Sequence, residues 1–90
     1  MKRVEIWMDP SFQVVCEVLL VREHRRWTST EYEYRTQWRS GPTEYRYQHF
    51  SNLSDAVAKA HEVLIEWGWE IDRAEPNVRI NHIKSKRSVV

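Results

Sequence analysis

The chain has few of the residues on which disulfide-bonded, phosphate-binding and membrane-spanning proteins depend. Its 90 residues include one cysteine, so an internal disulfide is excluded and the chain suits a reducing compartment. With two glycines, it has no glycine-rich phosphate loop. No apolar run approaches the roughly 20 residues that cross a membrane, and none has the form of a secretory signal. We therefore expect a soluble, cytoplasmic protein.

The chain also has almost no excess of charge of one sign. Its formal net charge is +1, so no global field attracts nucleic acid or an anionic membrane. The charges nevertheless separate along the sequence. Residues 22–50 carry six arginines against four glutamates, and residues 53–75 carry six acids against two bases. A role in nucleic-acid binding would need a local basic patch.

Length and composition predict one small domain. A chain of 90 residues has a limited core, and five tryptophans with four tyrosines supply much of the surface that it can bury. We expect a single α+β domain over residues 1–83. A basic, flexible tail over residues 84–90 is expected to follow it.

Alternation of apolar and polar residues predicts four strands. Residues 4–8 and 12–23 flank a turn and predict a first hairpin. Residues 12–23 are apolar on both faces, which is typical of a central strand. A helix is the competing prediction for so long an apolar run, but its many β-branched valines favour a strand. Residues 31–39 and 45–50 flank a turn that contains Gly41, and their strict alternation predicts a second hairpin.

A helix is predicted after the second hairpin. Apolar residues recur at helical spacing over residues 53–67. Ser51, Asn52 and Ser54 are all candidates for the N-terminal cap, and Asn52 with Asp55 three residues later resembles a capping box. Gly68 predicts the end of the helix. We expect Asp55 and Lys59 to pair one turn apart on the solvent side.

These elements predict an antiparallel β-meander of about four strands with one α-helix packed across one face. A short C-terminal edge strand at Val78 and Ile80, after Pro76, could join it. One helix covers a strip about 10 Å wide, whereas four strands about 4.8 Å apart span more. The rest of the sheet therefore needs another cover, such as a partner, a second copy or long arginine side chains.

Side chains that could support catalysis or hold a metal are scattered. Cys16 lies within an apolar strand, where a thiol is usually buried and unreactive. The four histidines do not have the spacing of metal ligands. Glu62 and Glu66 lie one turn apart, as on an ordinary solvated helix face. We therefore predict no catalytic residues, no metal and no cofactor.

Aromatic residues and arginines alternate on the second hairpin. Trp, Tyr and Arg dominate binding interfaces, but the same aromatic residues favour strands and can equally pack a core, so both interpretations remain open. The candidates for partner binding are Trp27, Arg35, Trp38, Arg39, Tyr45, Arg46 and Tyr47. The candidates for phosphate contacts are Arg22, Arg25 and Arg26.

A protein partner suits this composition best, because arginines mixed with acids at low net charge are typical of protein interfaces. We expect a non-catalytic protein-binding module that docks through the aromatic and arginine-rich sheet surface. Homodimerisation through the open sheet face is a further option. In size and style the chain is similar to small phage or mobile-element inhibitors of host machinery, anti-CRISPR proteins among them.

The alternative is a domain that reads DNA or RNA. Three strands followed by a helix over residues 14–67, with Arg and Trp on the strands, resemble the AP2-type and integrase arm-binding domains. These domains lay a three-stranded sheet in the DNA major groove, so the resemblance implies a nucleic-acid interface made by the strands. The chain departs from this pattern at Glu31, Glu33 and Glu44, whose carboxylates would repel phosphates.

Overall fold

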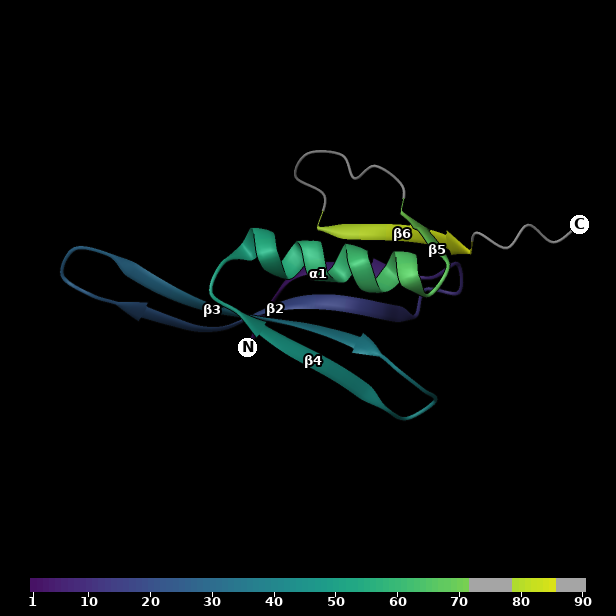
Figure 1. Cartoon of the computed structure of the whole chain (residues 1–90), viewed down its shortest axis with the longest axis horizontal. Helices are drawn as coiled ribbons and strands as arrows, with labels where there is room; N and C mark the ends of the chain where they lie inside the picture. Colours follow the sequence, from purple (N-terminus) through teal and green to yellow (C-terminus); the bar gives the residue numbers. More distant parts are fainter. Residues whose placement is uncertain (72–78, 86–90) are drawn as a thin grey trace, which may run out of the picture.

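The computed structural model describes residues 1–71 and 79–85. Within these residues, one helix packs against one face of a curled sheet (Figure 1). The elements are β1 (Lys2–Met8), β2 (Val14–Arg25), β3 (Thr30–Arg39), β4 (Tyr45–Phe50), α1 (Leu53–Glu66), β5 (Trp69–Ile71) and β6 (Ile80–Ser85). The six strands lie in the order β4-β3-β2-β1-β6-β5.

The α+β class is confirmed, but a plain four-stranded meander is wrong. β1 to β4 do pair consecutively and antiparallel. β6 then returns to pair parallel with β1, placing Ile80 opposite Ile6, and β5 follows as the other edge. The C-terminal strand therefore lies inside the sheet and includes Lys84 and Ser85. Pro76, Val78 and residues 86–90 lie outside the described residues.

α1 begins and ends where the capping residues predict. The Asn52 side chain accepts a hydrogen bond from the Asp55 backbone N–H at 2.9 Å. Gly68 has a φ of 82°, a left-handed conformation that glycine adopts freely at the end of a helix. Lys59, expected to pair with Asp55, instead lies 3.4 Å from the Glu62 carboxylate, with its ammonium 5.6 Å from the centre of the Trp38 ring. In the described part of the chain, no helix has the length and hydropathy needed to cross a membrane.

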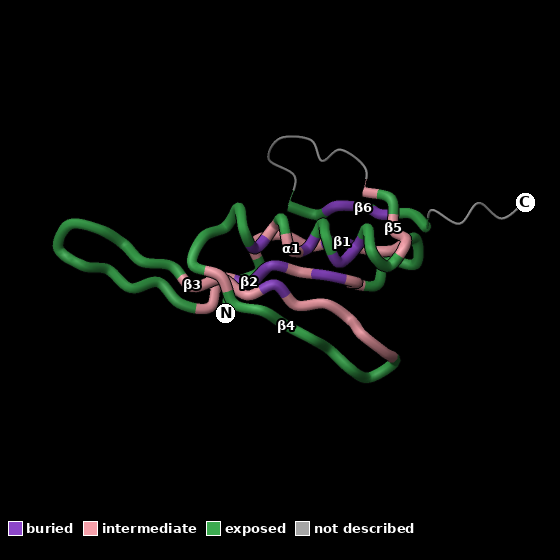
Figure 2. The backbone as a smooth tube through the Cα atoms, in the orientation of Figure 1, coloured by how far each residue is buried: buried purple, intermediate pink, exposed green. Residues whose placement is uncertain are grey.

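The core lies between α1 and the inner face of the sheet (Figure 2). Thr36 is fully buried there, and its hydroxyl donates a 2.7 Å hydrogen bond to the Ala56 carbonyl oxygen, which ties β3 to the helix. Tyr34, Trp38 and Phe50 are partly buried against the same core. The fully buried side chains that surround them are Trp7, Cys16, Val18, Ala56, Ala60, Leu64 and Ile83.

Replacing Thr36 by valine tests the tie between β3 and α1. Thr36→Val keeps the shape of the side chain but puts a methyl group against the Ala56 carbonyl oxygen, so we expect the free energy of unfolding to fall by about 1 to 2 kcal/mol. Urea denaturation measures this change. Thr43→Val, in the exposed β3–β4 turn, is the control and should stay within about 0.5 kcal/mol of wild type. Equal stability of all three proteins would contradict the role given to the hydroxyl.

Cys16 makes stability depend on pH. Burial raises the pKa of its thiol from 9.0 to about 12, because the thiolate loses its solvation in the core. Between these values the unfolded chain has lost the proton that the folded chain retains, so the free energy of unfolding falls as the pH rises. We expect a steeper fall for wild type than for Cys16→Ala in urea titrations from about pH 8 to pH 10.5. Parallel curves would show that the thiol contributes nothing.

Candidate functional site: a projecting arm and an open sheet face

Residues 22–33 form a two-stranded arm that projects beyond the rest of the sheet (Figure 1). A register shift between Leu20 and Arg22 marks a bulge at its base, where a strand bends and its twist increases. At the tip, the Arg26 backbone N–H donates to the Ser29 carbonyl oxygen at 2.7 Å. The arm is exposed along nearly its whole length (Figure 2) and forms one end of a molecule that measures 58 × 30 × 20 Å.

Trp27 lies in the turn at the tip of the arm. Its relative exposure is 104%, so folding buries none of its large apolar surface. Tryptophan is among the residue types that carry most of the binding energy in protein interfaces. Among the large hydrophobic side chains of the described residues, Trp27 is the most exposed.

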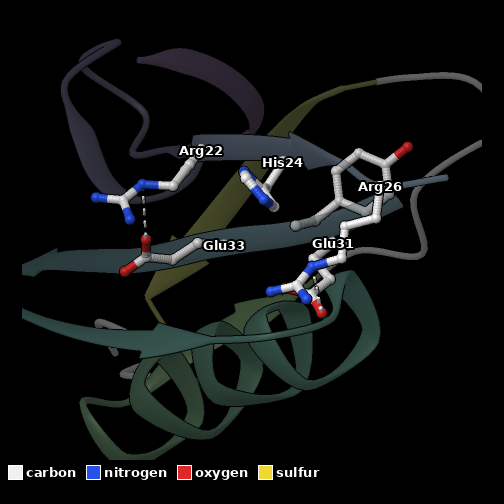
Figure 3. Close-up of a pocket in the computed structure, with 6 residues that line it drawn as sticks. Arg22, His24, Arg26, Glu31 and Glu33 are labelled. Carbon is white, nitrogen blue, oxygen red and sulfur yellow. Dashed lines mark ion pairs between the residues drawn. The ribbon is translucent and has the colours of Figure 1, made fainter. Parts of the chain in front are cut away.

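Each arginine of the arm faces a glutamate. Figure 3 shows Arg22 and Glu33, then Arg26 and Glu31, on either side of His24 around a polar pocket of about 360 Å³. The three nitrogen–oxygen distances are 3.8 Å for Arg22–Glu33, 3.4 Å for Arg25–Glu23 and 3.4 Å for Arg26–Glu31. Exposed pairs of this kind add little stability, but they leave the arm with alternating charge.

The sheet face opposite α1 continues from the base of the arm. Glu33 lies 2.8 Å from Nδ1 of His49, and the His49 ring meets the edge of the Tyr47 ring at 5.6 Å between centres. The Arg35 guanidinium lies 5.1 Å from the centre of the Tyr47 ring, as in a cation–π contact. Tyr45 and Tyr47 are more than half exposed. We call Arg35, Tyr45, Tyr47 and His49 the open face.

The structure divides the candidate residues between two sides of the sheet. Trp38 and Arg46 lie opposite each other on the side that faces α1, where Trp38 packs against the core. Arg39 donates to the carbonyl oxygens of Gly41, at 3.2 Å, and Pro42, at 2.9 Å, and so holds the β3–β4 turn. The candidates brought together by the arm and the open face are Arg22, Arg26, Trp27, Arg35, Tyr45 and Tyr47. Arg25 also lies on the arm, but opposite Thr30 on the other side of the sheet.

Sequence reasoning considered Glu33 on the strand surface only as a group that would repel phosphates, and it did not name His49 as a candidate. Their 2.8 Å contact joins the arm to the open face. The signal was available in the alternation, because His49 falls on the same face as Tyr45 and Tyr47 along its strand. What the pattern could not supply was the cross-strand register that places Glu33 within reach.

A second pocket, of about 400 Å³, lies at the opposite end of the sheet from the arm. Asp9 at its rim accepts hydrogen bonds from the backbone N–H groups of Gln13 and Ser11, which lower the pKa of its carboxyl group. The two charged side chains that line this pocket therefore stabilise neighbouring turns: Asp9 the β1–β2 turn, and Arg39 the β3–β4 turn. Its lining residues are Asp9, Val15, Arg39, Gly41, Pro42, Trp67 and Trp69.

The arm and the open face offer rings, hydrogen-bond groups and ion pairs, which suit noncovalent recognition. Across residues 1–71 and 79–85, no three His, Cys, Asp or Glu side chains are placed to hold a metal ion. Comparison with protein-family models, with curated proteins and with solved structures found no match for this chain.

Proposed function

We propose that the protein is a non-catalytic binding module that docks on a protein partner through the arm and the open face. The observation that carries this proposal is the fully exposed Trp27 at the tip of an arm whose charges are already paired. A projecting tryptophan can enter a pocket that a flat sheet surface cannot reach. Such a module acts by occupying a partner's surface, as an inhibitor or an adaptor does.

The ion pairs on the arm favour a protein over a nucleic acid. A phosphate group that bound Arg22 or Arg26 would lie close to the carboxylate of Glu33 or Glu31, which would repel it. A protein surface can instead match both signs, since alternating charges set the orientation of a complex and exclude wrong partners. Of the residues that a DNA-reading sheet would use, Trp38 is also removed, because it packs against the core on the side of β3 that faces α1.

The open face extends the contact that Trp27 begins. Tyr45 and Tyr47 present large, rigid rings at low entropic cost, and Arg35 is held in place by stacking on Tyr47. Glu33 and His49 connect this row to the arm. A partner that receives Trp27 can therefore rest against the base of the arm without any rearrangement of the sheet.

Trp27→Ala should weaken capture of the partner by at least about 30-fold, because a hot-spot residue contributes about 2 kcal/mol or more. The side chain is fully exposed, so circular dichroism and thermal unfolding should match wild type. Affinity capture of the tagged protein, followed by titration of the recovered partner, measures the effect. Ile65→Ala, an exposed apolar residue on α1, is the matched control and should bind as wild type does.

Nuclease treatment and salt distinguish the two classes of partner. A protein recovered by wild type and by Ile65→Ala, resistant to nuclease and lost with Trp27→Ala, would support the proposal. Equal recovery by Trp27→Ala would overturn it. Nucleic acid whose recovery falls steeply with salt, and falls further with Arg35→Ala, would instead establish the alternative function.

A further inference from the structure

The two edges of the sheet differ in how they are protected against pairing. β5 is three residues long, and a short edge strand resists pairing. β4 is six residues long, YRYQHF, with no proline, lysine or register shift, which are the features that usually block an edge. Along its outer side lies no other described element (Figure 1).

The hydrogen bonds of the β3–β4 hairpin show which groups this edge offers. The Ser40 N–H donates to the Glu44 carbonyl oxygen at 2.9 Å, so these two residues form a hydrogen-bonded pair. Bonded and non-bonded pairs alternate along an antiparallel ladder. Counting along the register, Arg46, Gln48 and Phe50 direct their N–H and C=O groups toward β3. Those of Tyr45, Tyr47 and His49 are directed outward.

We propose that β4 pairs antiparallel with β4 of a second copy, about a two-fold axis that passes through Tyr47. In this register Tyr47 lies opposite Tyr47 of the second copy, and Tyr45 lies opposite its His49. Every outward N–H and C=O of these three residues then finds a partner. Two sheets of six strands become one, and the two open faces become a single continuous surface.

The side chains favour this register and this occupant. Arg46 lies opposite Gln48 of the second copy, so no like charges are directly opposed, and the aromatic pairs at the centre are the kind that stabilise a sheet. A shift of two residues in one direction sets the two Arg46 side chains against each other. A shift in the other direction leaves Tyr45 opposite Ser51, which lies outside the strand. The strand is therefore complementary to itself in one register.

Because Tyr47 lies on the proposed two-fold axis, any side chain placed at this position faces its own copy in the dimer. Wild type should have twice the 11.0 kDa mass of one chain in light scattering after size exclusion. Tyr47→Lys and Tyr47→Glu each place two like charges together, so each variant alone should be a monomer. An equimolar mixture of the two should recover the doubled mass, because lysine then faces glutamate. Thr43→Lys, in the turn beyond the strand, is the control and should remain a dimer.

Three results would overturn the proposal. One is a wild-type protein that stays at 11.0 kDa up to about 1 mM, where even a millimolar dimer is populated. Another is a dimer that survives both substitutions, which would place the contact elsewhere. The last is a mixture that stays monomeric while circular dichroism shows both variants folded, since this would exclude the register through Tyr47. The dimer does not depend on the proposed docking function, so the two proposals succeed or fail separately.

Discussion

A single helix covers a single face of the sheet, and the rest of the molecule follows from this constraint. α1 buries Ala56, Ala60 and Leu64 against the inner face and fixes its position there through the hydrogen bond to Thr36. Because side chains alternate along each strand, the helix decides which residues are buried in the part of the sheet that it covers. Those that point toward it become core. Most of those that point away are exposed, but side chains of this chain cover some of them: Leu19, opposite Arg35, is 7% exposed.

The arm is the part of the sheet that the helix does not reach. Beyond Arg22 the β2–β3 ladder continues without a core beneath it, and an isolated two-stranded ribbon is marginally stable in water. Cross-strand ion pairs add some support, although exposed pairs are individually weak. Such a ribbon contributes little to folding, and the proposed docking function would give the exposed Trp27 a role that folding does not.

Features set by residues close together in the sequence could be predicted, whereas contacts between residues far apart in the sequence could not. The Asn52 cap and the end of the helix at Gly68 depend on neighbouring residues. Asn52 was one of three cap candidates, and Gly68 was correctly predicted. The parallel pairing of β6 with β1 joins Ile6 to Ile80, and no local pattern specifies a contact so distant in sequence. The residues of the open face were partly predictable, because alternation along the strands places Trp38 on the side opposite to them. The sequence does not show which of the two sides the helix buries.

The hydrogen-bond parity of β4 gives the open face its particular character. The residues whose side chains lie on that face, Tyr45, Tyr47 and His49, are also those whose backbone groups are directed outward from the edge. The side-chain face and the direction of the backbone N–H and C=O groups both alternate with a period of two. If the helix covered the other face, or if the turn register shifted by one residue, the outward backbone groups would belong to residues whose side chains are covered. Here the Ser40–Glu44 bond and the position of α1 bring them into phase. A strand added at this edge therefore meets the aromatic row directly, and edge pairing and face docking extend one surface.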